Sequence, residues 1–409
     1  MSVAKPKVII YSDHLLYPSE TFILAQASAL SEFEPVYAGS RRVVGLDLAT
    51  RQIHLLNQRD SMWGRCRELA FKLTGFAPNF LKRLGALGPA LLHAHHGPNG
   101  LRALPIAGHL GIPLIITFHG SDVTISDVRY QKVTLGYRHY MANKERLKRS
   151  GALFLPVSNF LRRKLVEQGF PEERALVHYT GVDTKKFQPA NKERDPLILF
   201  VGRLEESKGA GFLIRAAGEV QKQLPEVELA LIGDGSLRDV LEKDAKQQLR
   251  RYRFLGVRTS EEVNEWMNRA SVVCVPSVRR RSGEQEGFGM ACAEAQAVAK
   301  PIVAFNSGGI SEVVCHGTTG LLAEEGDWQA LAGHLLMLLQ SPELRARFGR
   351  SGREWVVRQF DLEHCTKRLE SIYHAEIENR TKGKNERIFQ RPESIPANIP
   401  SSVSASARC

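Results

Sequence analysis

The chain has 409 residues, of which 43% are hydrophobic and 24% charged, and this composition excludes a fibrous or largely disordered protein. Lys and Arg outnumber Asp and Glu by 56 to 44, and the net charge of +12 favours anionic partners such as nucleotides, nucleic acid or an acidic lipid surface. Because single hydrophobic cores rarely exceed about 250–300 residues, the length predicts two domains.

The N-terminal sequence MSVAKPKVIIYSD has a short apolar run followed at once by polar residues, which is typical of a first strand and not of a signal peptide. No stretch approaches the ~18–20 apolar residues of a membrane span. The six cysteines form no CxxC pair of the kind that binds zinc, and their scatter fits a reducing cytoplasm. We therefore expect a cytoplasmic protein that would meet a membrane only from one side.

The first half of the chain contains five apolar runs that predict strands. They are KVIIYS (7–12), LLHAH (91–95), PLIITFHG (113–120), ALFLPVS (152–158) and ALVHYTGV (175–182), and an amphipathic helix is expected near residues 20–30. Such runs predict a doubly wound parallel sheet, interrupted by a long insertion around residues 40–90. We place this Rossmann-like domain at residues 1–190.

The second half alternates strand and helix patterns more regularly, which is the signature of a second Rossmann-like domain at residues 191–360. The polar stretch QPANKERDP (188–196) is the expected joint, so the two domains would face each other across a cleft. A C-terminal helix at 361–378 is expected to pack back on the first domain. Residues 379–409 are rich in Ser, Pro and charge and predict a disordered tail. The strand runs here are LILFVG (197–202), ELALIG (228–233), RFLG (253–256), SVVCVP (271–276) and PIVAF (301–305).

Ligands of open α/β sheets bind beyond the carboxyl ends of the strands, so residues there are candidates for a site. In FVGRLEESKG, Arg203 and Lys208 follow a strand and precede a helix, and two cations beside a helix N-terminus can bind a diphosphate. A solvated loop is the alternative for such a pair. In the LIGDGS turn, Gly233 and Gly235 would let the backbone approach a ligand, although such turns are often purely structural.

Two carboxylates flank a short glycine turn in EQEGFGMACAEA. Glu286 precedes Gly287, Phe288 and Gly289 at the expected start of a helix, and Glu294 lies about two turns inside it at ~3.6 residues per turn. A carboxylate accepts hydrogen bonds from vicinal hydroxyls, so the pair could hold two sugars of one extended ligand. A solvated helix face or an ion pair with nearby arginines is the alternative for each. A glycosidase pair is disfavoured because both carboxylates lie along one loop and helix.

Histidines follow two strands of the first domain. His119 in TFHGSD would face the cleft and could hydrogen-bond with a hydroxyl. His93, His95 and His96 in HAHH raise the question of a metal site, but no carboxylate motif accompanies them. Packing at a strand end, or lining the cleft, is the favoured interpretation.

In combination, GRLEESKG, GDG, Glu286-GFG-x4-Glu294 and HGSD resemble the retaining family-4 glycosyltransferases of the GT-B fold. PIVAFNSGGISEVVCHGTTGLL (301–322) is similar to the segment that follows in that family, and the resemblance reaches about residue 375.

The resemblance implies a retaining hexosyltransferase whose donor, a UDP- or GDP-linked sugar, binds the C-terminal domain. Arg203 and Lys208 would bind the diphosphate and stabilise the leaving group, and the GDG turn would join the donor site. Glu294 would bind the ribose, Glu286 with the amides of residues 287–289 would contact the transferred sugar, and His119 would lie beside that sugar. The family implies no cofactor and no metal ion, and the sequence has no Asp-x-Asp motif.

The chain departs from the family pattern after the first strand, where Pro18, Ser19 and Glu20 stand in place of a glycine-rich loop. PSETFI resembles a branch that assembles exopolysaccharide and cell-surface glycans. The implied acceptor is a hydroxyl of a lipid-linked or growing surface polysaccharide, such as exopolysaccharide, capsule or lipopolysaccharide. A catalytically inactive nucleotide-sugar-binding protein is the alternative. Nucleic-acid binding is disfavoured because no recognition motif accompanies the basic charge.

The insertion RDSMWGRCRELAFKLTGFAPNFLKRL (59–84) mixes aromatic and basic residues at helical spacing. Such a segment can lie in an anionic membrane interface, which would give peripheral contact with the inner leaflet. A helix that packs its apolar face on the N-terminal domain is the alternative.

Overall fold

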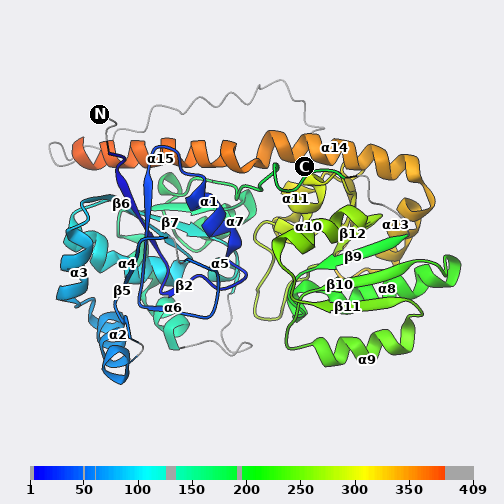
Figure 1. Ribbon diagram of the computed structural model, residues 1–409, viewed down its shortest axis with the longest axis horizontal. Coiled ribbons are helices and arrows are strands. Elements are labelled where there is room, and N and C mark those ends of the chain that lie inside the picture. Colours follow the sequence, from blue (N-terminus) through cyan, green and yellow to red (C-terminus); the bar gives the residue numbers. More distant parts are fainter. Residues whose placement is uncertain (1–3, 49–50, 60, 126–134, 191–195, 383–409) are drawn as a thin grey trace.

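The computed structural model describes the whole chain except residues 1–3, 49–50, 60, 126–134, 191–195 and 383–409. Two α/β domains lie side by side (Figure 1), and each contains a six-stranded parallel sheet. Parallel sheets are covered by helices on both faces, which is why their strands are continuous apolar runs. The arrangement is the GT-B fold expected from the sequence.

The N-terminal sheet has the strand order β5-β3-β1-β6-β7-β8. Its central strands are buried apolar runs, as in LIITF of β7. The strands are β1 (Lys7–Tyr11), β3 (Glu34–Gly39), β5 (Ile53–Leu55), β6 (Pro89–His95), β7 (Leu114–Phe118) and β8 (Leu153–Pro156), and β2 (His14–Leu15) pairs with β4 (Arg41–Arg42) in a small separate sheet.

Helices surround this sheet. The loops that join the carboxyl ends of its strands to the following helices face the cleft. The helices are α1 (Thr21–Ser28), α2 (Met62–Thr74), α3 (Pro78–Gly85), α4 (Gly97–Leu110), α5 (Ser121–Thr124), α6 (Leu135–Lys148) and α7 (Asn159–Glu167), with a 3-10 turn, η2, at Glu172–Arg174.

The C-terminal sheet has the order β11-β10-β9-β12-β13-β14, and its topology resembles that of the first. The strands are β9 (Leu197–Val201), β10 (Glu228–Ile232), β11 (Tyr252–Gly256), β12 (Val272–Val275), β13 (Ile302–Phe305) and β14 (Gly320–Ala323). The helices are α8 (Ala210–Gln223), α9 (Arg238–Gln248), α10 (Ser260–Arg269), α11 (Met290–Ala297), α12 (Ile310–Val313), α13 (Trp328–Gln340) and α14 (Pro342–Phe360), and the 3-10 turn η3 (Glu206–Lys208) precedes α8.

The chain crosses back to the N-terminal domain after α14, and helix α15 (Leu362–Lys382) runs along that domain (Figure 1). Leu369, Ile372 and Tyr373 of α15 belong to the same buried cluster as Val8 and Ile10 of β1. α15 therefore completes the core of the first domain.

The chain passes between the domains twice, once near Val182 and once between α14 and α15, and these two crossing segments are in contact. The Val182 N–H donates to the Phe360 carbonyl at 2.8 Å, and the Leu362 N–H donates to the Val182 carbonyl at 2.9 Å. The Arg353 guanidinium donates to the carbonyls of Thr184 and Phe187 at 3.1 and 2.8 Å. The joint between the domains is thus a hydrogen-bonded pair of segments.

Three expectations are corrected. Residues 175–182 do not form a strand; they carry isolated bridges and serve as the loop that leads to the crossing. The region 40–90 is not only an insertion, because it supplies β5 of the sheet as well as α2 and α3. Helix α15 continues to Lys382, so residues 379–382 are helical and not part of a disordered tail; residues 383–409 lie outside the described residues.

Helix length and hydropathy exclude one kind of membrane contact for the described part of the chain: none of its helices combines the length and the apolar character needed to cross a bilayer.

Candidate active site

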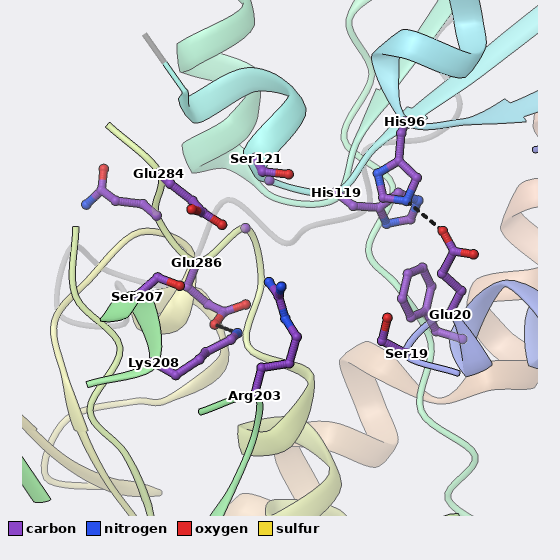
Figure 2. A pocket seen from close by; sticks show the side chains of 14 residues that line it. Ser19, Glu20, His96, His119, Ser121, Arg203, Ser207, Lys208, Glu284 and Glu286 are labelled. Carbon is purple, nitrogen blue, oxygen red and sulfur yellow. Dashed lines mark hydrogen bonds and ion pairs between the residues drawn. The ribbon is translucent and has the colours of Figure 1, made fainter. Parts of the chain in front are cut away.

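A cavity of about 210 Å³ lies between the carboxyl edges of the two sheets (Figure 2). Both domains contribute to its wall. Arg203, Ser207, Lys208, Glu284, Gln285, Glu286 and Gly287 line it from the C-terminal side, and Ser19, Glu20, Phe22, His96, His119, Gly120 and Ser121 line it from the N-terminal side. The cavity therefore brings together His119, Arg203, Lys208 and Glu286, the four residues expected from the sequence to be catalytic.

Arg203 and Lys208 lie on the loop between β9 and α8, at the N-terminus of a 14-residue helix. The Arg203 side chain points into the cavity (Figure 2). The positive end of the α8 dipole and two cations lie at one end of the cavity, which favours a bound anion.

Glu286 is paired with Lys208 across the floor of the cavity. The Lys208 ammonium donates to Glu286 Oε2 at 2.5 Å, and the Ser277 hydroxyl donates to the same oxygen at 3.2 Å. Burial alone would raise the pKa of Glu286, but the Lys208 ammonium and these hydrogen bonds hold it below its ordinary value. Glu286 is therefore an ionised acceptor, suited to a sugar hydroxyl.

Gly287, Phe288 and Gly289 lead from Glu286 into α11. Gly287 lies against the other domain, since a Cβ there would come within 2.1 Å of the His119 carbonyl oxygen. Gly289 has φ of 99° and precedes the first turn of α11. The Phe288 ring is buried against the rings of Tyr179 and Phe360, so only its backbone could contact a donor.

Glu294 lies in the second turn of α11, outside the residues that line the cavity. Burial raises the pKa of Glu294 to about 7, with a small opposing effect of Lys186. No side-chain hydrogen bond of Glu294 is seen among the described residues. This half-buried carboxylate can therefore accept hydrogen bonds from a ligand that reaches α11.

Gly233 and Gly235 also lie outside the cavity wall. A Cβ at Gly233 would come within 1.9 Å of the Gly202 carbonyl oxygen, and one at Gly235 within 2.5 Å of the Leu204 carbonyl oxygen. These glycines let the loop after β10 pack closely on the loop that carries Arg203. Close packing of the two loops therefore requires glycine at both positions. Contact of these glycines with the donor remains a prediction.

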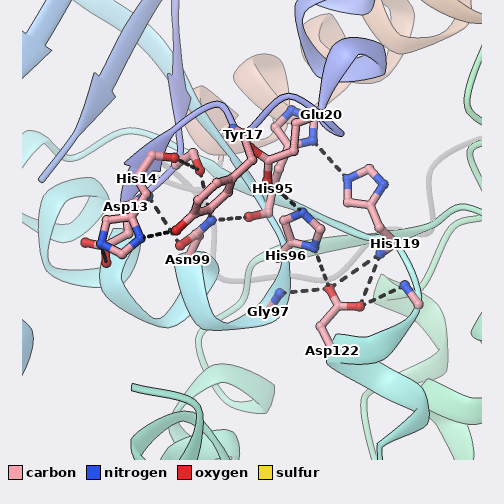
Figure 3. A network of polar contacts seen from close by, with 12 residues as sticks. Asp13, His14, Tyr17, Glu20, His95, His96, Gly97, Asn99, His119 and Asp122 are labelled. Carbon is pink, nitrogen blue, oxygen red and sulfur yellow. Dashed lines mark hydrogen bonds and ion pairs between the residues drawn. The ribbon is translucent and has the colours of Figure 1, made fainter. Parts of the chain in front are cut away.

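His119 directly follows β7 and is held in place from several sides (Figure 3). Its Nε2 is 3.1 Å from Nδ1 of His95, and its ring centroid is 4.8 Å from that of Phe22. Burial and the neighbouring histidine His96 lower its pKa well below the ordinary value. His119 is therefore a neutral imidazole that can exchange hydrogen bonds with a hydroxyl.

Asp122 fixes the loops around His119. Its carboxylate accepts hydrogen bonds from the backbone N–H groups of Gly97, His119 and Gly120, at 3.0, 3.2 and 2.9 Å (Figure 3). Three otherwise unpaired amides are satisfied by one buried carboxylate, which orders both strand ends of the cleft.

The histidines of HAHH have different positions. His93 is buried between the Tyr373 hydroxyl at 2.6 Å and the Thr117 hydroxyl at 2.7 Å, and His95 contacts His119. His96 lines the cavity. No group of three His, Cys, Asp or Glu side chains in the described part of the chain is arranged to hold a metal ion.

Sequence reasoning gave no role to eight residues that line the cavity: Ser19, Glu20, Phe22, Gly120, Ser121, Ser207, Glu284 and Gln285. Ser121 and Ser207 follow β7 and β9, so the rule for carboxyl edges could have found them. Glu20 stands in the PSETFI segment, where the departure from the family pattern was a signal.

Comparison with known proteins supports the same fold and family. Residues 182–355 match the family model for glycosyl transferases group 1, and residues 47–186 match the model for Glycosyltransferase Family 4. In structure, the chain is similar to Anabaena HepE in complex with UDP and glucose, with a TM-score of 0.73 and 18% identity over 90% of this chain and 100% of that chain.

Two bacterial relatives are similar in sequence. The amylovoran biosynthesis glycosyltransferase AmsK of Erwinia amylovora is 30% identical over 82% of this chain and 91% of its own length. WcaL of Escherichia coli, whose name assigns it to colanic acid biosynthesis, is 31% identical over 69% of this chain and 70% of its own length. The chain belongs to the family-4 glycosyltransferases and has the GT-B fold.

Proposed function

We propose that the protein is a retaining, metal-independent hexosyltransferase. Its donor would be a UDP- or GDP-linked sugar, and its acceptor a hydroxyl of a lipid-linked or growing surface polysaccharide. The observation that carries this proposal is the single cavity in which Arg203, Lys208 and Glu286 of one domain face His119 of the other. The names of AmsK and WcaL, in amylovoran and colanic acid biosynthesis, favour a polysaccharide acceptor.

The charges of the cavity suit loss of a nucleoside diphosphate. As the bond between sugar and diphosphate breaks, negative charge grows on the leaving oxygen, where Arg203, Lys208 and the α8 N-terminus can stabilise it. These groups belong to the chain itself, so no metal ion is required for this task. Glu286 and His119 would hold hydroxyls of the sugar, and Glu294 would hold those of the ribose.

Retention would follow from attack on the same face that the diphosphate leaves, with a phosphate oxygen accepting the proton of the acceptor hydroxyl. The groups placed around the cavity would bind and orient, and Glu286, paired with Lys208, is assigned a binding role. Nuclear magnetic resonance of the first product formed from an α-linked donor would test this: an α linkage supports retention, and a β linkage overturns it.

The donor proposal is tested by a thermal-shift panel of UDP-, GDP- and ADP-sugars. A ligand that binds only the folded protein stabilises it by ~2.7 kcal/mol when its free concentration is a hundred times Kd, and this raises the midpoint temperature of unfolding. One nucleotide class should shift the midpoint, with and without EDTA. If none does, the transferase proposal fails; if the shift needs a divalent ion, metal independence fails.

We further propose that the protein works in the cytoplasm in peripheral contact with the inner leaflet through α2. Met62, Trp63, Leu69 and Leu73 of this helix, with Phe76 just after it, are 60–82% exposed. Elsewhere in the described chain, the large exposed apolar side chains Val44, Val240 and Val257 belong to separate segments. A contiguous exposed apolar surface indicates a partner.

The spacing along α2 and its charges favour an anionic lipid surface as that partner. At ~3.6 residues per turn, Met62, Leu69 and Leu73 share one side of the helix, whereas the buried residues Glu68 and Phe71 lie on the other. Arg65 lies next to this side of the helix, and Arg67 lies next to Trp63. Basic residues that flank an apolar helix face are typical of segments at a membrane interface.

A vesicle flotation assay tests this contact. The wild type should float with vesicles that contain phosphatidylglycerol and much less with phosphatidylcholine alone, because each basic residue adds about 1 kcal/mol near an anionic surface. The combined change Trp63→Ser, Leu69→Ser and Leu73→Ser should abolish flotation, whereas Val240→Ser with Val257→Ser should not. Equal flotation of both variants, or none of the wild type, would contradict the proposal, as would a monomer–dimer change in place of lipid binding.

A further inference from the structure

The N-terminal wall of the cavity carries a charged pair that the donor chemistry does not use. Glu20 precedes α1, and His96 stands between β6 and α4, and both side chains line the cavity opposite Lys208 and Glu286 (Figure 2). The distance from His96 Nε2 to Glu20 Oε1 is 3.4 Å.

The Glu20 carboxylate is held in a fixed position although it borders the cavity. The Tyr17 N–H donates to Glu20 Oε2 at 2.8 Å, and the Glu20 N–H donates back to the Tyr17 carbonyl at 2.9 Å. Each carboxylate oxygen can accept two hydrogen bonds. With one contact used on each oxygen, both can accept another from a ligand.

His96 has a backbone conformation that a non-glycine residue adopts only under constraint. Its φ is 70°, which costs on the order of 1 kcal/mol or more. The His96 N–H donates to the Thr117 carbonyl at 2.8 Å, and the His96 carbonyl accepts from the Gly100 N–H at 2.9 Å. These bonds keep the imidazole directed at Glu20.

The imidazole of His96 lies between two carboxylates. Glu20 is on one side, and Asp122 Oδ2 is 3.8 Å from Nδ1 on the other (Figure 3). Burial alone would lower the pKa of His96, but the hydrogen bond with Glu20 and the charge of Asp122 raise it above the ordinary value. Both carboxylates thus favour the protonated form of the His96 imidazole.

The Glu20 carboxylate is unfavourable for the donor diphosphate, because like charges in one cavity repel. The two cations of the opposite wall, Arg203 and Lys208, lie on the donor side of the cavity, and Lys208 is paired with Glu286. The ligand group that suits Glu20 is therefore a neutral hydrogen-bond donor, and a saccharide supplies several as hydroxyls.

We propose that Glu20, oriented by His96, forms a subsite for a pyranose hydroxyl of the acceptor. This inference rests on the proposed function, since it assigns the C-terminal wall to the donor and the N-terminal wall to the acceptor. Glu20 sets which acceptor hydroxyls are accepted, and His96 is a positioning residue that holds the carboxylate in its direction.

Hydroxyls of the donor sugar have the same chemistry, so the test measures the two ligands separately. Saturation-transfer nuclear magnetic resonance would follow methyl glucoside, methyl galactoside and methyl mannoside on protein saturated with UDP or GDP. Thermal shift would follow the nucleotide sugar that stabilises the wild type. Glu20→Gln should weaken glycoside binding about 10-fold, the loss expected for one charged hydrogen bond, and leave the nucleotide-sugar shift unchanged.

Glu32→Gln is the matched control, because Glu32 pairs with His374 at 2.6 Å in the same domain, away from the cavity. It should bind glycosides as the wild type does. His96→Gln should weaken glycoside binding as much as Glu20→Gln does. Glu20→Asp keeps the carboxylate and should bind glycosides better than Glu20→Gln; a purely structural role of Glu20 would not predict this difference.

The inference is overturned if no glycoside binds the wild type, if Glu20→Gln binds glycosides normally, or if it loses the nucleotide sugar instead. Failure of the wild type to bind any nucleotide sugar would count against the proposed function, whatever the glycosides do.

Discussion

Glu312 of the C-terminal domain accepts backbone hydrogen bonds from Asn159 and Phe160 at the start of α7 in the N-terminal domain, at 2.8 and 2.7 Å. The Tyr179 hydroxyl donates to the same carboxylate at 3.0 Å, and its pKa is raised, chiefly by burial and then by the charge of Glu312. A carboxylate at a helix N-terminus is stabilised by free amides and by the helix dipole. One side chain thus links the two domains.

Glu312→Ala should lower kcat about 10-fold or more, because catalytic groups from two domains must be held in one geometry. Small-angle scattering should show a larger radius of gyration. Ser158→Ala is the control: the Ser158 hydroxyl caps the same helix by accepting from Leu161 N–H, without crossing between domains. Both changes should cost about 1 kcal/mol of stability, but only Glu312→Ala should affect turnover. Equal turnover in both variants would exclude the role of Glu312 in closure.

Gly287→Ala should reduce turnover about 100-fold, since a misplacement of ~1 Å is enough for such a loss. The added methyl would lie 2.1 Å from the His119 carbonyl oxygen, so the domains must separate at the cavity. Gly108→Ala on α4 is the control, because a Cβ there meets nothing within 4 Å; it should stabilise the fold by about 0.5–1 kcal/mol. A fully active Gly287→Ala enzyme would show that the closed contact is dispensable.

Arg203→Ala should lower kcat by roughly 100- to 1000-fold, the range seen when one stabilising group is removed from developing negative charge. Arg203 is exposed, so the thermal midpoint should stay within a degree or two of the wild type. Arg215→Ala, an exposed change on α8 outside the cavity, should leave both quantities unaltered. Normal turnover of Arg203→Ala would remove the proposed leaving-group role.

Glu294 should make stability and donor binding depend on pH. Its pKa of about 7 is above the ordinary 4.5, so the fold favours the protonated form and the wild type loses stability as pH rises from 4.5 through 7. Relative to it, Glu294→Gln should gain up to about 3 kcal/mol at pH 8 and nothing at pH 4. Denaturant melts at both values measure this.

The same group should act in the opposite direction on the donor. If the ionised carboxylate binds ribose, nucleotide affinity of the wild type should increase as pH rises through 7, and that of Glu294→Gln should change much less. Parallel pH profiles of the two proteins in titration calorimetry would argue against ribose contact.

The sequence predicted strands well where they are central. β9, β10 and β12 are buried on both faces, so they are continuous apolar runs that end in glycine or proline. The edge strand β5 has three half-buried residues and gave no such signal. Residues 175–182 follow β8 through hydrogen bonds of Leu176 and His178 but form only isolated bridges, and the segment then meets the start of α15 at Val182.

The sequence could predict a site residue only where its position relative to the end of one strand places it at the cleft. His119 and Arg203 come just after β7 and β9, and Lys208 and Glu286 lie on the loops that lead from β9 and β12 to the next helices; the structure places all four around one cavity, although their roles remain predictions. The pairing of Glu20 with His96 depends on how two separate loops approach each other. That approach is set by the tertiary fold, since neither residue has local partners that reveal it.

Helix α15 has a consequence for the order in which the chain becomes structured. Its residues Leu369, Ile372 and Tyr373 fill the core beside β1, so the N-terminal domain lacks part of its core until residues 362–382 have been synthesised. The C-terminal domain, which lies between the two crossings, has its whole sheet available earlier. During translation, when domains usually fold from the N-terminus onward, the domain that begins first here is completed last.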